Sequence, residues 1–382
     1  MLTRMAKTRP STAIVPLSSE PVDLAREVVA MVGASASAAI DHATLDAAFR
    51  AWSANTRRAF RSDLALWGRW CRQNSVEPVH GGPELVARWI RSLAGIDAGE
   101  GKGRAMATIE RYLVHVGRAY RIAGLADPTS AERVRLELKA TRHVLRVRQR
   151  QAHPIRFKGE IADLDSPPSG LSLLALLKAC RRDALGYRDA AILRLAYDTG
   201  VRRSELVRID VADIEGPDAE GAGVLFIPTS KTDRKGEGAH AYLAPATMAA
   251  IAKWREAGDI RKGPLFRRVV THFDGSIDRI GHDPLHPNSV ALIFKRLVRT
   301  AWDKRLLGEM SEAQLERMVA AVSSHSIRVG VAQDNFAAGE GLPAIMQAYR
   351  WRDARTVMRY GARLAAKSGA SARLAQRFSQ EL

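Results

Sequence analysis

The stretch that decides the fold of the second half of the chain reads HSIRVGVAQDNFAAG over residues 325–339 and MQAYRWRDARTVMRY over residues 346–360. Both segments have helical character, and the three-residue spacing places His325 and Arg328 on one helical face. Trp351 and Tyr360 lie on the last strongly helical stretch of the chain. A His-x-x-Arg pair or a tyrosine beside an arginine is common by chance, so these residues gain meaning only from what accompanies them.

Two segments that precede this stretch add further phosphate-directed side chains. Residues 200–206 read GVRRSEL, and an arginine such as Arg202, just after the helix-stopping Gly200, can project its guanidinium group from a helix start. Alternating residues over 224–230 and 239–243 predict a β-hairpin, with Lys231 at the end of its first strand. Lys235, nearer the tip of the hairpin, is a less favoured alternative to Lys231.

The composition restricts the partners of the protein. The 382 residues include 59 Lys and Arg against 41 Asp and Glu, for a net charge of +18. Such an excess favours a polyanion, either a nucleic acid or an anionic membrane. No apolar run approaches the ~18 residues of a membrane-spanning helix, and residues 1–16 lack the apolar core of a secretory signal. Cys71 and Cys180 are interpreted as reduced core thiols. We therefore expect a cytoplasmic protein that handles nucleic acid.

A compact helical domain is expected over residues 41–147, after a flexible tail over residues 1–40. Apolar residues recur at helical spacing in one stripe: Phe60, Leu64, Trp67 and Cys71. Arginines occupy the other faces of the same segment and are candidates for DNA contact: Arg57, Arg58 and Arg61. Further helices are expected from Pro83 and from about residue 104 to residue 122.

The last helix of this domain has one apolar and one cationic stripe. The cationic stripe consists of Arg135, Lys139, Arg142 and Arg146, at positions i, i+4, i+7 and i+11. Acidic side chains are few in this stretch, so we interpret the stripe as a phosphate-contacting face rather than a solvated one.

Residues 148–172, with their arginines and a Ser-Pro-Pro-Ser-Gly run, are interpreted as an interdomain linker. The second domain is expected over residues 173–382, with helices from Pro245 to the end. The predicted fold class is mainly α with a small antiparallel β-sheet. No metal site is expected, because the acidic run over residues 274–283 lacks helical spacing and includes two glycines, which favours a solvated loop.

Taken in order, the arginine motif at 200–206, the His-x-x-Arg box and the Trp-to-Tyr interval resemble the tyrosine recombinase (phage integrase) family. The segment WSANTRRAFRSDLALWGRWC, residues 52–71, is similar to the DNA-clamping domain of Cre-like recombinases, the group that the chain resembles most. The likeness covers most of the chain except the first ~40 residues. It implies a two-domain clamp on duplex DNA.

The resemblance implies a role for each matching residue. Tyr360 would attack the scissile phosphate, and Arg202 and Arg328 would hold its non-bridging oxygens. Lys231 would protonate the departing 5′-oxygen, and His325 would assist proton transfer from the tyrosine. Tyr349 is a rival nucleophile, but its apolar neighbours favour core packing.

Two further residues match the family pattern: Trp351 would donate its indole N–H to the phosphate, and Glu205 would orient the basic groups. Asn288 lies where Cre-like recombinases carry an arginine that reads a base. Because an amide side chain prefers adenine and an arginine prefers guanine, the resemblance does not predict which DNA sequence this chain recognises. Fixed cations stabilise the charge that builds on a phosphate during transfer, so no metal, cofactor or ATP is expected.

The implied activity is site-specific recombination through a 3′-phosphotyrosine intermediate and a Holliday junction, by a homotetramer on two inverted-repeat DNA sites. A C-terminal helix with Leu374, Phe378 and Leu382 would dock on a neighbouring subunit, or else pack within its own chain. A bacterial, phage or plasmid context is expected. The alternatives are a type IB topoisomerase, a telomere resolvase, and a non-catalytic DNA-binding regulator.

Overall fold

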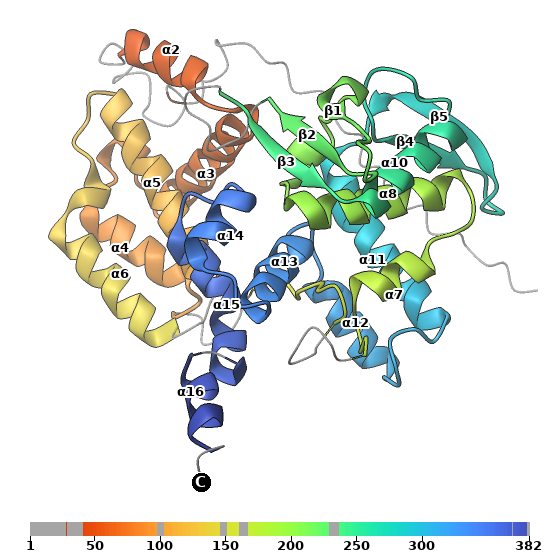
Figure 1. The fold of residues 1–382 in the computed structure, drawn as a ribbon. Helices are drawn as coiled ribbons and strands as arrows, with labels where there is room; N and C mark the ends of the chain where they lie inside the picture. Colours follow the sequence, from red (N-terminus) through yellow and green to blue (C-terminus); the bar gives the residue numbers. More distant parts are fainter. Residues whose placement is uncertain are drawn as a thin grey trace, which may run out of the picture. The chain divides into compact units, whose positions relative to one another are not determined.

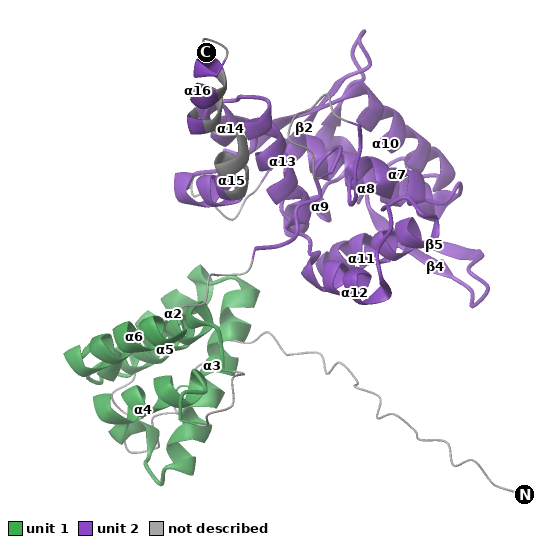
Figure 2. Cartoon of the chain, turned by 90° about the horizontal axis from the view of Figure 1, so that it is seen from below, with its two compact units in different colours: residues 1–149 green, residues 150–382 purple. Residues whose placement is uncertain are grey.

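The chain forms two compact units, residues 1–149 and 150–382, in the computed structural model (Figure 2). The structure describes residue 28 and residues 41–97, 103–145, 151–159, 167–228, 237–368 and 370–379. The predicted tail, residues 1–40, lies outside the described residues except for Val28, which is buried in the core of the first unit. The sequence-based domain boundaries remain predictions.

The first unit is helical in all its described regular elements (Figure 1). These are α2 (His42–Ala51), α3 (Ala54–Gln73), α4 (Pro83–Leu93), α5 (Met106–Ile122) and α6 (Glu132–Leu145), with 3₁₀ turns at Pro78–His80 and Pro128–Ser130. Ser53 caps α3 by accepting the backbone N–H of Thr56, and Pro83 opens α4, where its missing N–H costs nothing.

The apolar stripe predicted on α3 forms the core of this unit. Phe60, Leu64, Trp67 and Cys71 are all buried. Removing apolar surface of this size from water is the main driving force for the packing of the helices. The buried carboxylate of Asp63 accepts from Arg111 at 3.0 Å and contacts His115 Nδ1 at 2.7 Å, so α5 also supplies the polar partners that a buried charge requires.

The second unit surrounds a larger core with helices and two small sheets. Its helices are α7 (Leu173–Ala179), α8 (Ala184–Thr199), α9 (Arg203–Leu206), α10 (Pro245–Ala257), α11 (Pro287–Asp303), α12 (Glu312–Ala321), α13 (Ser326–Ala337), α14 (Leu342–Ala348), α15 (Ala354–Ser368) and α16 (Ala370–Phe378), with a 3₁₀ turn at Val211–Asp213. Its strands are β1 (Ile214–Glu215), β2 (Gly223–Ile227), β3 (Ala239–Leu243), β4 (Arg267–Thr271) and β5 (Ile277–Pro284).

The predicted hairpin is confirmed as β2 and β3, which pair antiparallel with Leu225 opposite Ala241, and β1 adds a third strand. The expectation of helices alone after Pro245 is wrong, because β4 and β5 form a second antiparallel sheet. Its turn contains Asp274 and Gly275, and Gly275 adopts a φ of +82°. An Asp-Gly pair between alternating strands is a hairpin signal that the helical interpretation overlooked.

The described parts of the predicted linker, residues 151–159 and 167–172, lie within the second unit. Ile155 and Leu171 are buried in its core, and the N–H of Ile155 donates to the carbonyl of Ser326 at 2.9 Å. Arg156 forms a buried ion pair with Asp334 on α13 at 2.6 Å. The segment interpreted as a linker because of its charges and prolines therefore includes residues that hold α13 in place.

Among the described helices, none is long and apolar enough to cross a membrane. At the C-terminal end, Leu374 and Phe378 on α16 are exposed, with 53% and 56% of their surface accessible. Leu382 lies outside the described residues. Docking of this helix on another subunit remains a prediction.

Candidate active site

The first part of the site forms where α8 ends. Gly200 caps α8 in the left-handed conformation, with φ +55°, and the chain turns directly into α9. Glu205 binds Arg202 twice: Oε1 accepts from Nη1 at 2.7 Å, and Oε2 accepts the backbone N–H at 2.9 Å. Glu205 is buried and Arg202 is half-buried, so the carboxylate fixes the guanidinium group at the edge of the core.

Arg328 lies one turn into α13 and is 5% exposed. Its Nη1 donates to the carbonyl of Gly200, which joins α13 to the end of α8. Burial is the main cause that lowers the pKa of Arg328 to about 10, and the positive charge of Arg202 lowers it further. Two guanidinium groups thus face one region from separate elements, an arrangement that attracts an anion.

Gly330, in the same box, permits a close approach of the backbone. A Cβ at this position would lie 1.9 Å from the carbonyl oxygen of Ile155. The glycine therefore allows the segment before α7 to cross α13 beside Arg328. Any larger residue would displace this segment or the helix that carries the arginine.

His325 precedes α13 and has an exposed side chain. Its pKa lies below the ordinary value of 6.5, first because of partial desolvation and then because of the positive charges of Arg328, Arg203 and Arg202. The positive charges of both arginine elements thus act on the histidine, and the neutral imidazole is its main form at neutral pH.

Trp351 and Tyr360 complete the group. The two rings meet edge to face with 6.0 Å between centroids, and the guanidinium carbon of Arg328 lies 5.2 Å from the Trp351 ring centroid. Tyr360 on α15 is 8% exposed, and its backbone carbonyl accepts from Gln333 on α13 at 3.1 Å. The contacts between α13 and α15 thus place the phenol beside the cationic end of α13 (Figure 1).

Among the described residues, two buried N–H donors at this site have no hydrogen-bond partner: the indole Nε1 of Trp351 and Nη1 of Arg350. A buried donor without a partner costs about 1–3 kcal/mol. A buried unsatisfied donor in a folded protein needs an explanation, and a catalytic role, in which a bound ligand supplies the acceptor, is one. Sequence reasoning found Trp351 but missed Arg350, although Arg350 directly precedes it, between the two aromatic residues Tyr349 and Trp351.

The remaining catalytic candidates from the sequence are two lysines and a second tyrosine. Lys231 and its rival Lys235 lie outside the described residues. Tyr349 packs on Gly200, where a Cβ would lie 2.8 Å from its ring, and its hydroxyl accepts from Asn335 at 3.1 Å. These contacts occupy Tyr349 within the core, as expected from its apolar neighbours.

The predicted DNA-contacting residues of α3 make local contacts. Arg57 donates to the carbonyl of Phe49 at 2.9 Å and lies over its ring, and Arg58 donates to Asn55 at 2.8 Å. Arg61 is half-buried. In the second unit, Asn288 is exposed in the first turn of α11, a position open to a ligand.

The cationic stripe on α6 has more acidic partners than the sequence indicates. Arg135 pairs with Glu132 at 2.5 Å, and Arg142 pairs with Glu110 on α5 at 2.7 Å. Only the fold brings Glu110 to this helix, which is why the local sequence reads as poor in acid. Lys139 is exposed, and Arg146 lies outside the described residues.

The acidic run over residues 274–283 belongs to the second hairpin, where Asp278 pairs with Arg279 at 2.8 Å. Within the described ranges, no three metal-ligating side chains come together.

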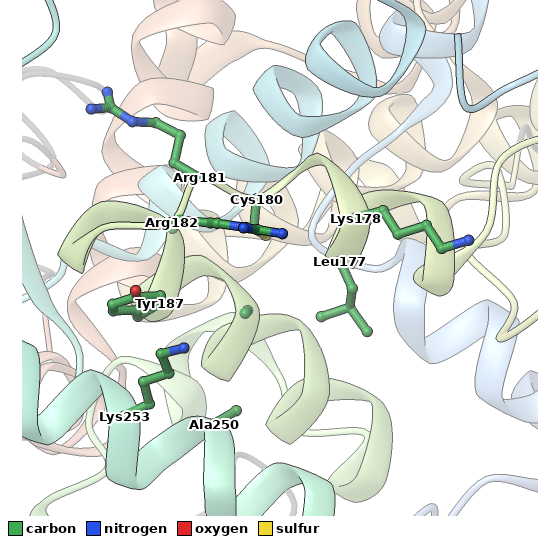
Figure 3. Close-up of a pocket in the computed structure, with 10 residues that line it drawn as sticks. Leu177, Lys178, Cys180, Arg181, Arg182, Tyr187, Ala250 and Lys253 are labelled. Carbon is green, nitrogen blue, oxygen red and sulfur yellow. The ribbon is translucent and has the colours of Figure 1, made fainter. Parts of the chain in front are cut away.

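A pocket of about 410 Å³ lies at the other end of α8, lined by residues of α7, α8 and α10 (Figure 3). Lys253 lies 4.4 Å from the ring centroid of Tyr187, and Arg181 donates to the carbonyl of Gly275 at 2.7 Å. Tyr187 and Thr199 are twelve residues apart on α8, which at 1.5 Å per residue corresponds to about 18 Å. This pocket is therefore separate from the site around Arg202.

Comparison with known proteins identifies the family to which the chain belongs. The model of the phage integrase family matches residues 172–367, slightly more than half of the 382 residues. The chain therefore belongs to the phage integrase family of tyrosine recombinases, and the resemblance inferred from the sequence is confirmed.

Among individual relatives, the recombinase Cre of Escherichia phage P1 is 27% identical over 331 residues, which cover 85% of this chain and 89% of Cre. An integrase/recombinase XerD homolog of Selenomonas ruminantium is 26% identical over 254 residues, or 65% of this chain and 67% of that protein.

A solved structure supports the fold. The XerH site-specific recombinase, in a post-cleavage complex with a palindromic difH substrate, has a TM-score of 0.54 and 11% identity. The match covers 92% of this chain and 94% of XerH. The predicted mainly helical architecture with small antiparallel sheets is confirmed.

Proposed function

We propose that this protein is a Cre-like site-specific DNA recombinase, which cleaves and rejoins DNA through a 3′-phosphotyrosine intermediate. The observation that carries the proposal is the position of Tyr360, packed on Trp351 beside the buried Arg328. A phenol in a cationic pocket with a buried unpartnered indole N–H matches the needs of an attack on a phosphodiester.

In this mechanism, Arg202 and Arg328 bind the non-bridging oxygens of the scissile phosphate. Arginine suits this role because its planar, permanently charged guanidinium group forms paired hydrogen bonds with phosphate oxygens. The indole N–H of Trp351 donates to the same phosphate and so gains an acceptor that the described residues do not supply. Glu205 keeps Arg202 oriented through its two hydrogen bonds.

The chemical step exchanges one ester for another. The phenolic oxygen of Tyr360 bonds to phosphorus, the phenolic proton passes to the neutral imidazole of His325, and the bond between phosphorus and the 5′-oxygen breaks. Lys231 supplies a proton to that oxygen. Rejoining runs the exchange in reverse with a second 5′-hydroxyl, so the phosphotyrosine ester retains the bond energy. Neither ATP nor a metal ion is required by this balance.

The proposal extends to the assembly. Four subunits would act on two double-stranded sites with inverted repeats and exchange two strands at a time through a Holliday junction. The exposed apolar residues of α16 would dock on the next subunit. The arginines of α3, the α6 stripe and Asn288 would contact the duplex, in the cytoplasm of a bacterial host.

The test uses DNA selected from a random-sequence duplex pool by repeated binding to the wild-type protein. We expect the selected duplex to form a covalent adduct at a 3′-phosphate, and peptide mapping to identify Tyr360 as the modified residue. Strand exchange between two duplexes of different length should follow. Binding without an adduct would favour a regulator, relaxation without exchange a type IB topoisomerase, and sealed hairpin ends a telomere resolvase.

The lowered pKa of His325 predicts the pH dependence of cleavage. Because the pKa lies below 6.5, the imidazole stays neutral and able to accept a proton down to slightly acidic pH. The rate of adduct formation should stay level from about pH 8 to about pH 6.5 and fall at lower pH. A His325→Gln variant should be slower and lack this acid-side fall. An identical acid-side fall in the variant would contradict the role of His325.

A further inference from the structure

Arg350 occupies a position of backbone strain at the end of α14. Its φ is +56°, in the left-handed region that glycine adopts freely. For a residue with a side chain this conformation costs about 1–2 kcal/mol. A long basic residue at a helix end where glycine would relieve strain indicates that the side chain has a use of its own.

The side chain of Arg350 reaches the carboxylate that orients Arg202. Its Nη2 lies 3.9 Å from Oε2 of Glu205 and donates to the carbonyl of Thr199 at 3.3 Å. The same Oε2 accepts the backbone N–H of Arg202. Glu205 is thus shared between two guanidinium groups that come from separate elements, the start of α9 and the end of α14.

The part of the chain that the structure describes does not satisfy every donor of this guanidinium group. The side chain of Arg350 is 13% exposed, and its buried Nη1 has no hydrogen-bond partner among those residues. Burial and the charge of Arg202 lower the pKa of Arg350, while Glu205 opposes them. An arginine kept for stability alone would have its donors paired, so its position is better explained by the charge that it brings to the site.

We propose that Arg350 is a positioning residue for phosphoryl transfer: it shares Glu205 with Arg202, fixes the Arg202 guanidinium group against the scissile phosphate, and offsets the carboxylate charge. This inference rests on the proposed function. Arg202 and Arg350 both pair with Glu205, and the charge of the same carboxylate acts on Arg328. Without it, Glu205 would neutralise half of the charge of Arg202 and Arg328.

The test compares Arg350→Gly, Arg350→Met and the control Arg352→Met. The glycine relieves the strained φ, methionine keeps the apolar stem, and Arg352 is an exposed neighbour of the same charge. At saturating selected duplex, both Arg350 variants should form the adduct about tenfold more slowly, which corresponds to about 1.4 kcal/mol of lost electrostatic stabilisation in the transition state. Arg352→Met should keep the wild-type rate. Arg350→Gly should keep the wild-type melting temperature or exceed it.

A second substrate separates charge from structure. It carries a methylphosphonate at the mapped scissile position, so the transferred group lacks its negative charge. Relative to wild type on the same DNA, the defect of Arg350→Met should shrink severalfold, because the lost cation matters less to a neutral group. An equal defect on both substrates, or no defect on either, would overturn the inference. If the wild-type protein itself forms no adduct, the proposed function fails and this inference fails with it.

Discussion

Replacing Tyr360 by phenylalanine is expected to abolish the covalent adduct while leaving DNA binding unchanged. Phenylalanine keeps the edge-to-face contact with Trp351, whose ring centroid lies 6.0 Å away, and removes only the oxygen that bonds to phosphorus. Loss of a nucleophile in a covalent mechanism costs about four orders of magnitude or more in rate. The measurement is the amount of adduct that resists detergent, alongside the affinity for the selected duplex.

Tyr349→Phe is the matched control. Both tyrosines belong to the same 15-residue stretch, and both pack against Trp351. Tyr349 loses only the hydrogen bond from Asn335, so its variant should keep cleavage near the wild-type rate. An adduct that persists in Tyr360→Phe but disappears in Tyr349→Phe would transfer the role of nucleophile to Tyr349.

Local patterns in the sequence predicted parts of the fold and most residues of the candidate site, although Trp351 lies between α14 and α15 and not on a helix as expected. Helical periodicity gave the buried stripe of α3, and strand alternation gave the hairpin of β2 and β3. The order of motifs located Arg202, Arg328, Trp351 and Tyr360, which the structure brings together in the second unit. These features depend on residues close in the sequence, or on a pattern of residue types, and both are visible without coordinates.

Features that depend on long-range contacts were not predictable in this way. The ion pair between Arg142 and Glu110 joins two helices, α6 and α5. Arg156 and Asp334 form an ion pair although they lie 178 residues apart in the sequence. The role of Arg350 was hidden for the same reason, because its partner Glu205 lies far away in the sequence. The charge pattern along one helix shows which of its residues are charged. It does not show which of those charges are paired with residues from other elements of the fold.

Asp334→Ala is expected to lower the free energy of unfolding more than any other proposed substitution, because it breaks the hydrogen-bond network that holds α13. The buried carboxylate accepts from Nε of Arg156 at 2.6 Å, from the N–H of Phe157 at 2.7 Å and from the hydroxyl of Tyr197 at 2.5 Å. Alanine would remove the carboxylate that pairs with the buried Arg156. Removing one partner of a buried ion pair costs about 3–5 kcal/mol in the free energy of unfolding.

The control is Glu316→Ala, which breaks the exposed pair between Glu316 and Arg299 at 3.0 Å. Exposed pairs contribute about 0–1 kcal/mol, so this variant should unfold near the wild-type urea concentration. Amide hydrogen exchange in the full chain separates the two units, and the loss in Asp334→Ala should be confined to the second. Because α13 carries Arg328 and contacts the helix of Tyr360, cleavage by Asp334→Ala should fall at the temperatures at which the amides of α13 lose their protection from exchange. Equal unfolding midpoints for the two variants would show that Asp334 does not hold α13.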